Sequence, residues 1–406
     1  MKAVVYGAGN IGRGFIGSLF ARAGYKVIFI DTAEIIVNEL RKKGSYPVRF
    51  LSGNSQKEIL MEDILVEGVS AVNSVNAEEV TDCIAGADIM ATAVGVRALS
   101  MIAPVFAGGL KKRFQTNAGP LNIIVCENLI DADLYLAELV KKNLDEQEIK
   151  LLKEKVGFVE ASIGRMAPIQ TPEMQDGNIL RICSEKYSFL PVNKDAFVGA
   201  IPEIEGLIPF GNFDFYIQRK LFIHNMGHAI CAYLGLLLGD SFISDTVARA
   251  DVLFIAQNAM LESAQALGKK FNVPLQGIID HVRDLLCRFN NRALKDTCVR
   301  VGADIERKLG PQDRFIGAMS CCKEQGVTPA FISIGAAAAL FSLLKERGLD
   351  QTEKKAAAAL GEISRLDANS AEAALVLDMY LEIVQGKNPA ELSHTALHLG
   401  NKQGVI

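Results

Sequence analysis

A short segment near the middle of the chain combines three side chains that together suit the oxidation of an alcohol: Lys220, Asn225 and His228. On an α-helix with about 100° between residues, His228 projects about 80° from Lys220 and Asn225 about 140°, so one broad face can present all three. A lysine desolvated in a cleft has a lowered pKa and can accept a hydroxyl proton. An asparagine amide can donate to a developing alkoxide, and a histidine can hold the reacting hydroxyl. A merely polar helix face gives the same pattern, so the spacing alone leaves the function open.

His224 adds a second histidine to this segment, four residues before His228. That spacing is used by metal ligands on a helix. No acidic or cysteine partner lies nearby in the sequence, so we expect no metal and a packing or substrate-contacting role for His224. A metal-dependent alcohol dehydrogenase remains the alternative, and it predicts that chelators abolish activity.

A second candidate site lies at the N-terminus, where a GxGxxG motif separates an apolar run at 3–6 from a helical pattern at 11–23. The first glycine of such a motif permits a tight turn, the second lets the backbone approach a pyrophosphate, and the third lets the helix pack on the strand. The helix N-terminus favours the phosphates. We therefore expect cofactor contacts from Gly7, Ala8, Gly9, Asn10, Ile11 and Gly12. The alternative is a glycine turn without a ligand.

The choice between NAD and NADP depends on Asp31, which follows a second apolar run at 27–30. An acidic residue at that place binds the adenosine ribose hydroxyls and repels a 2′-phosphate. Thr32 is not an arginine that could receive this phosphate. The sequence therefore favours NAD. Asn10 and Arg13 could also touch phosphate, or could only cap and solvate the helix.

The elements that must position these residues change character along the chain. Apolar runs at 3–6, 27–30, 88–94, 121–126 and 156–161 alternate with helical patterns, which predicts a parallel sheet covered on both faces. Two further strands are predicted at 45–55 and 64–75. From about residue 194, helical spacing dominates, with helices predicted at 217–238, 244–267, 274–289, 329–346 and 371–385. Thr328 should cap the fourth of these helices, before a proline at its first position.

The predicted fold is thus α/β, with an N-terminal Rossmann-type doubly wound sheet followed by a mostly α-helical C-terminal domain. We place the NAD-binding domain at 1–195 and the helical substrate and catalytic domain at 196–406, with the active site between them.

Composition limits the partners and the compartment. The net charge is −4 and no basic run is longer than Lys111-Lys112-Arg113, which argues against a nucleic-acid surface. The eight cysteines form no CxxC motif and mostly lie in apolar runs, as expected for free thiols in a reducing compartment. We find no signal peptide and no apolar stretch of the ~18 residues that span a bilayer. We therefore expect a cytoplasmic monomer or homodimer that binds a small molecule, without a membrane or a nucleic acid.

The chain also resembles the polyol-specific long-chain dehydrogenase/reductase family nearly from end to end. The residues that carry the resemblance are 7–17, 92–95, 120–124, 126–128, 219–222, 225 with 227–230, and 366–370. The resemblance implies that Lys220 is the general base, that Asn225 and Asn128 stabilise the alkoxide, and that His228 binds the reacting oxygen without a metal. It also implies cofactor contacts from Thr92, Val94 and Gly95.

The short chain is most similar to the branch of this family that acts on phosphorylated substrates. That branch implies NAD-dependent interconversion of a hexitol phosphate and a ketose phosphate, most simply mannitol 1-phosphate and fructose 6-phosphate. Candidates for phosphate recognition, each of which could instead form an ion pair, are Arg165, Arg292, Lys295, Arg300 and Arg307, because an arginine fork suits a phosphate.

Several departures from the family pattern cluster where substrate should bind. His224 and Met226 stand where the branch has an apolar and a small polar residue, Gly164 replaces an acidic residue, and 169–193 matches weakly. The departures leave open a dehydrogenase of an unphosphorylated polyol or a sugar acid. A non-catalytic NAD-binding regulator on the same fold is the other alternative.

Overall fold

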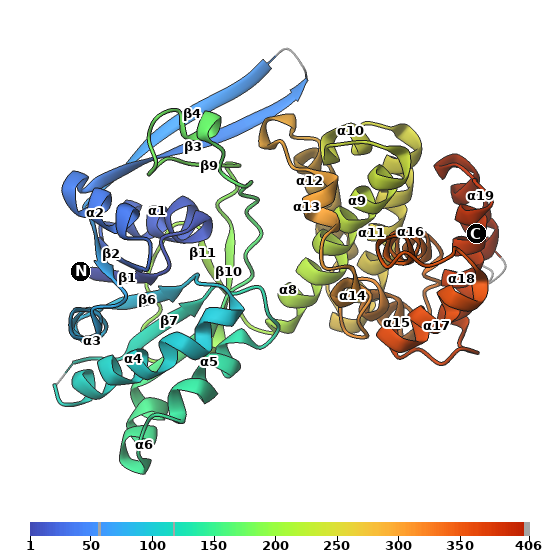
Figure 1. The fold of residues 1–406 in the computed structure, drawn as a ribbon. Helices are drawn as coiled ribbons and strands as arrows, with labels where there is room; N and C mark the ends of the chain where they lie inside the picture. Colours follow the sequence, from blue (N-terminus) through green and yellow to red (C-terminus); the bar gives the residue numbers. More distant parts are fainter. Residues whose placement is uncertain (56–57, 117, 402–406) are drawn as a thin grey trace. The chain divides into compact units, whose positions relative to one another are not determined.

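The computed structural model describes residues 1–55, 58–116 and 118–401, and the chain forms two compact units (Figure 1). The first comprises Met1–Ser52 with Leu60–Phe213, and the second is made mostly of the chain from Asp214 onward. The division therefore falls at 213/214, whereas the sequence analysis placed it at 195/196. The reason is local: β10 (Leu190–Asn193) pairs in parallel with β11 (Leu207–Phe210), which holds the chain after residue 195 in the first unit.

The centre of the first unit is a six-stranded parallel sheet of order β5-β2-β1-β6-β7-β8. Its strands are β1 (Lys2–Tyr6), β2 (Lys26–Asp31), β5 (Val69–Asn73), β6 (Ile89–Thr92), β7 (Leu121–Val125) and β8 (Val156–Glu160). This is the doubly wound order, in which strands are added first on one side of β1 and then on the other. The predicted fold class is confirmed.

Helices cover both faces of this sheet, which explains why its strands are continuous apolar runs. In β1, Ala3 and Val5 pack into one core, and Val4 and Tyr6 into the other. The first core is shared with η1 and α2, and the second with α3 to α6. The helical segments of this unit are η1 (Gly12–Gly17), α1 (Ser18–Arg22), α2 (Glu34–Lys43), α3 (Ala77–Ala85), α4 (Val96–Phe114), α5 (Ala132–Lys141), α6 (Glu146–Lys155), α7 (Pro172–Gln175) and η2 (Lys194–Ala196).

A second sheet has the order β4-β3-β9, with strands β3 (Ser45–Ser55), β4 (Glu58–Glu67) and β9 (Ile182–Ser184). The sequence analysis treated 64–75 as one additional strand, and this is wrong. Gly68 takes a φ of +71° and ends β4, after which Val69–Asn73 enters the main sheet as β5.

The second unit is helical, as predicted, and a helical run from Asp214 to Leu238 passes through its core. The bounds are α8 (Asp214–Arg219), η3 (Lys220–Asn225), α9 (Met226–Leu238), α10 (Ile243–Val247), α11 (Ala250–Phe271), α12 (Leu275–Phe289), η4 (Arg292–Leu294), α13 (Cys298–Gly302), α14 (Ile305–Lys308), α15 (Ile316–Glu324), α16 (Ala330–Glu346), α17 (Glu353–Ser364), α18 (Ala371–Val384) and α19 (Pro389–Asn401). Helix α9 contacts α11, α13 and α16.

The run Asp214–Leu238 is long and apolar enough to cross a membrane by length and composition. The sequence analysis found no such stretch because charged residues at 219–220 interrupt the apolar pattern. Within the structure, 67% of its most apolar window is buried, and the neighbours of α9 are other helices of the unit. The run therefore has the environment of a core helix.

Candidate active site

The predicted nucleotide turn, residues 7–12, has the geometry that each of its glycines implies. Gly7 has a φ of +106°, and a Cβ added there would lie 2.3 Å from the carbonyl oxygen of Ala93. A Cβ on Gly12 would lie 1.8 Å from the carbonyl oxygen of Gly7. By contrast, a Cβ on Gly9 would meet no atom within 4 Å. Protein packing therefore explains two of the glycines, and the third faces open space where a phosphate could approach the backbone. The turn fits a dinucleotide.

The peptide at Ala8 is fixed from both sides by charged side chains. Asp31 Oδ2 accepts a hydrogen bond from the N–H of Ala8 at 2.6 Å, and its Oδ1 accepts one from Ala33 at 2.9 Å. On the other side, Arg13 Nε donates to the carbonyl oxygen of Ala8 at 2.6 Å. Asp31 stands at the end of β2, as predicted, and its contact with the ribose remains a prediction.

Arg13 and Asn10 both turn toward protein in this structure. Arg13 is 5% exposed, and its Nη1 donates to the carbonyl oxygen of Leu180 at 2.6 Å. Asn10 Nδ2 donates to the carbonyl oxygen of Pro168 at 3.0 Å. Arg13 was expected either to touch phosphate or to cap and solvate the helix, and the structure shows a third role: its guanidinium lies in the interior and anchors the turn.

After the end of β6, two residues that the resemblance implies as cofactor contacts, Val94 and Gly95, have their backbone N–H groups bound by a carboxylate that the sequence analysis did not assign. Glu127, 5% exposed, accepts hydrogen bonds from the N–H groups of Val94 at 3.0 Å and Gly95 at 2.8 Å. Thr92 is fully buried, and its hydroxyl has no hydrogen-bond partner among the described residues. Glu127 therefore fixes the backbone just before α4. Its position next to Asn128, a predicted catalytic residue, was the one sequence feature that could have indicated this role.

The structure distributes the four predicted catalytic residues over both units. Asn128 is exposed just beyond the carboxyl end of β7, in the first unit. Lys220, Asn225 and His228 belong to the second unit. That Asn128 joins the other three in one site remains a prediction.

The catalytic segment is not a regular α-helix, and this corrects the angles derived from the sequence. Residues Lys220–Asn225 form the π-helix η3 between α8 and α9. Because a π-helix has a wider turn, steps of 100° do not apply between Lys220 and Asn225. Both side chains are half-buried, and His228 follows in the first turn of α9. Single π-helical turns occur frequently at functional sites, and the second one here, η1, follows the nucleotide turn.

His228 has two neighbours that the sequence analysis missed. Its Nε2 lies 3.1 Å from Asp296 Oδ2, and its ring stacks on Phe289 with centroids 4.8 Å apart and an interplanar angle of 9°. Arg300 Nε donates to Asp296 Oδ1 at 2.7 Å. Burial opposes ionisation of Asp296, but His228 and Arg300 outweigh it and lower the pKa of this carboxyl. The Asp296 carboxylate thus lies beside the imidazole of His228 as an ion-pair partner. Nothing in the local sequence pairs position 296 with position 228.

His224 is buried and neutral in electropositive surroundings. Burial, and after it the positive charges of Arg288 and Lys220, hold its pKa well below the usual value. Burial and the charges of Arg219 and Arg288 likewise lower the pKa of His281 to about 3. Within the described parts of the chain, no group of three or more His, Cys, Asp or Glu side chains could hold a metal ion.

The predicted phosphate-binding cations differ in environment. Arg165 is 7% exposed; it donates to the carbonyl oxygens of Gly14 and Tyr187, and its guanidinium lies 4.2 Å from the ring centroid of Phe15. The guanidinium of Arg165 is therefore engaged by groups inside the first unit. The three other arginines form ion pairs: Arg292 with Asp245 at 3.5 Å, Arg307 with Asp313 at 3.1 Å, and Arg300 with Asp296. Lys295 is exposed, and its backbone has a φ of +48°.

A doubly wound sheet with an open glycine turn, followed by a helical unit that carries lysine, asparagine and histidine on one helix, defines a two-domain dehydrogenase. Residues 1–206 match the mannitol dehydrogenase Rossmann domain, and residues 212–374 match the mannitol dehydrogenase C-terminal domain. The chain belongs to the mannitol dehydrogenase family.

Two solved structures share this fold over almost the whole chain. A D-sorbitol dehydrogenase in substrate-free form is 15% identical, with a TM-score of 0.77 over 97% of this chain and 95% of that chain. The mannitol 2-dehydrogenase of Pseudomonas fluorescens, in a complex with NAD and D-mannitol, is 15% identical, with a TM-score of 0.73 over 98% and 94%.

Family membership defines the class of activity. The chain is an NAD-dependent oxidoreductase of the polyol dehydrogenase class, and the predictions of the family and of NAD as cofactor are confirmed.

Proposed function

We propose that the chain is a mannitol-1-phosphate 5-dehydrogenase, which interconverts mannitol 1-phosphate and fructose 6-phosphate with NAD. The observation that carries the phosphate is the electropositive surroundings of the catalytic helix. Burial is the largest cause of the low pKa of His224 and His281, and the positive charges of Arg288, Lys220 and Arg219 add to it. Arg288 is itself paired with Asp284 at 3.3 Å. The cations that carry the proposal are Arg219 and Lys220. A dianionic phosphate would be stabilised by such surroundings, whereas a neutral polyol gains nothing from them.

In the proposed reaction, four side chains act on one hydroxyl group of the substrate. Neutral Lys220 accepts the hydroxyl proton, and the amides of Asn225 and Asn128 donate to the oxygen as negative charge develops on it. His228, oriented by Asp296, holds the same oxygen. NAD, held at the nucleotide turn, would supply the acceptor for the carbinol hydrogen, which leaves as hydride. In the reverse direction, protonated Lys220 returns its proton to the ketose oxygen.

The second candidate is a dehydrogenase of an unphosphorylated polyol or a sugar acid. The burial of Arg165 and the ion pairs of Arg292, Arg300 and Arg307 favour it, because these cations are engaged with protein groups. The likeness to sorbitol and mannitol 2-dehydrogenases concerns the fold at 15% identity and does not decide between the substrates.

The test is reduction of NAD+ by purified protein with mannitol 1-phosphate, mannitol, sorbitol and a hexonate at equal concentration. The proposal predicts turnover with the phosphate at least ~100-fold faster than with mannitol, since a buried, paired phosphate contributes several charge-assisted hydrogen bonds. Addition of EDTA should leave the rate unchanged. Loss of activity in EDTA would indicate the metal-dependent alternative. NADH binding without turnover of any substrate would indicate the non-catalytic regulator.

We also propose a cytoplasmic location. All eight cysteines are free, and seven of them are buried, which suits a reducing compartment.

A further inference from the structure

Residues 163–193, which include the weakly matching segment 169–193, contact the nucleotide turn and the π-helix η1, and the sequence analysis did not predict these contacts. Three side chains connect the two: Arg13 donates to Leu180, Asn10 to Pro168, and Arg165 to Gly14, in each case to the carbonyl oxygen. Packing is equally close, because a Cβ on Gly14 would lie 2.5 Å from Ile182 Cγ2. The segment therefore packs against the nucleotide turn and the π-helix η1 and holds both through hydrogen bonds.

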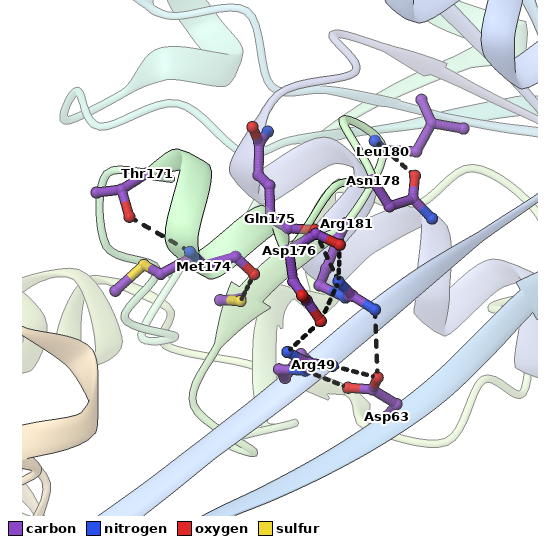
Figure 2. A network of polar contacts seen from close by, with 10 residues as sticks. Arg49, Asp63, Thr171, Met174, Gln175, Asp176, Asn178, Leu180 and Arg181 are labelled. Atoms are coloured by element: carbon purple, nitrogen blue, oxygen red, sulfur yellow. Dashed lines mark hydrogen bonds and ion pairs between the residues drawn. The ribbon is translucent and has the colours of Figure 1, made fainter.

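The loop that supplies the Leu180 carbonyl is itself held by a charge cluster of four residues, Arg49, Asp63, Asp176 and Arg181 (Figure 2). Arg49 in β3 donates to both oxygens of Asp63 in β4, at 2.6 and 2.8 Å. Arg181 lies 3.6 Å from Asp63 and 3.2 Å from Asp176, and it also donates to the carbonyl oxygen of Gln175 at 2.7 Å. Arg49 and Arg181 have side chains only 17% and 12% exposed, so these contacts are less screened than ordinary surface pairs.

Arg181 is the member of the cluster that connects it to the nucleotide turn. It follows Leu180, whose carbonyl receives Arg13, and it precedes β9, which pairs in parallel with β3. Arg13 in turn donates to the carbonyl of Ala8, the second residue of the nucleotide turn. A continuous path thus leads from strands β3 and β4 through an ion pair to Arg181, along the chain to Leu180, and through the hydrogen bonds of Arg13 to the peptide that the cofactor phosphates would approach.

We propose that the charge cluster Arg49–Asp63–Asp176–Arg181 positions the nucleotide turn through Arg13 and thereby sets the affinity for NAD. These are positioning residues, since the path acts through Arg13 and not by contact with the cofactor. The inference rests on NAD binding at the turn, but it does not depend on which sugar is the substrate.

The structure offers a matched control in the same sheet. Glu62, next to Asp63 in β4, forms an ion pair with Lys186 at 2.6 Å, and both side chains are more than half exposed. Neither residue contacts the loop carbonyls or the nucleotide turn in any described hydrogen bond. Glu62→Gln and Lys186→Gln therefore remove the same charges as Asp63→Asn and Arg181→Gln without breaking the path.

The experiment measures the Kd for NADH by fluorescence titration in the absence of sugar, with the melting temperature recorded for each variant. Arg181→Gln and Asp63→Asn should each weaken NADH binding about three- to tenfold, the range of coupling through such networks. Their KM for NADH should rise in parallel, while kcat at saturating NADH changes less than twofold. Arg181→Lys should be intermediate, because lysine keeps the charge but loses the planar fork. The two control variants should bind NADH like the wild type.

An unchanged Kd in Arg181→Gln and Asp63→Asn would overturn the proposal, as would equal weakening in Glu62→Gln and Lys186→Gln. If Arg181→Gln does not fold, the Kd for NADH of Asp63→Asn and of Arg181→Lys tests the proposal instead. Because no sugar is present, failure here is separate from failure of the substrate assignment.

Discussion

Asp296 Oδ2 lies 3.1 Å from Nε2 of His228, and the same carboxylate pairs with Arg300. We expect this contact to set the orientation of the imidazole, and therefore which ring nitrogen can be directed at a substrate oxygen. A carboxylate behind a histidine that touches substrate acts as a positioning group.

Replacing Asp296 with asparagine should lower kcat/KM for the sugar by about 10- to 100-fold, the usual effect of such supporting partners. The Kd for NADH should stay within twofold of wild type. Asp280→Asn is the matched control, because Asp280 is an exposed carboxylate that pairs with Arg283. Full activity in Asp296→Asn would show that His228 needs no such orientation.

Lys220→Ala should remove the general base and reduce kcat by roughly 10²- to 10⁴-fold, the contribution expected from a positioned proton acceptor. NADH binding should be nearly unchanged, because Lys220 lies in the helical unit. Stopped-flow and steady-state rates with the sugar provide the measurement. The control is Lys269→Ala, which removes an exposed lysine bonded to the carbonyl of Gln325. Survival of turnover within a few-fold of wild type would refute the assigned role.

Asp31→Ala should relax the preference for NADH over NADPH by about tenfold or more, since it removes both the repulsion of a 2′-phosphate and bonds to a charged group. Because Asp31 also holds the N–H of Ala8, NADH affinity itself should fall. Asp88→Ala controls for losing a carboxylate bonded to a backbone amide, here that of Lys2. The ratio of kcat/KM for the two cofactors is the readout, and an unchanged ratio would mean that Asp31 does not face the ribose.

Two histidines with a lowered pKa, buried His224 and half-buried His281, make the free energy of unfolding depend on pH in the acid range. The pKa of His281 is about 3 in the folded chain, against about 6.5 when unfolded. Between these values the unfolded state binds more protons, so stability is fully present above pH 6.5 and is lost as the pH falls toward 3. At pH 5 the loss from His281 is at most about 2 kcal/mol. His224 contributes in the same direction.

His281→Gln should therefore flatten, but not abolish, the fall in the free energy of unfolding between pH 7 and pH 5. Urea titrations at both pH values measure it. His394→Gln, on α19, serves as the control histidine. Identical pH dependence in wild type and His281→Gln would contradict the half-buried, neutral state of His281.

The sequence was sufficient to predict those parts of the fold that depend on a pattern within one short segment. Continuous apolar runs predicted a sheet buried on both faces, and the glycine spacing predicted the turn that the structure shows. Gly9 is the clearest case, because the missing side chain leaves space that no protein atom fills.

The sequence was insufficient where a partner comes from elsewhere in the chain. Thr328 was expected to cap α16, but the helix begins at Ala330 without a side-chain cap. Glu262 of α11 instead accepts hydrogen bonds from the N–H groups of Phe331 and Ile332. Asp296 beside His228 and Glu127 beside Val94 and Gly95 are similar, since each contact depends on tertiary packing and not on a repeated spacing. The π-helical turn at Lys220–Asn225 is also invisible to a pattern read at 100° per residue.

The central claim is that the substrate carries a phosphate. Its most direct test is the oxidation of NADH, followed by absorbance, with fructose 6-phosphate and with fructose at equal concentrations. The account predicts turnover with fructose 6-phosphate and little or none with fructose. Faster turnover of fructose than of its phosphate would contradict it, and would move the substrate to an unphosphorylated polyol on the same fold and cofactor.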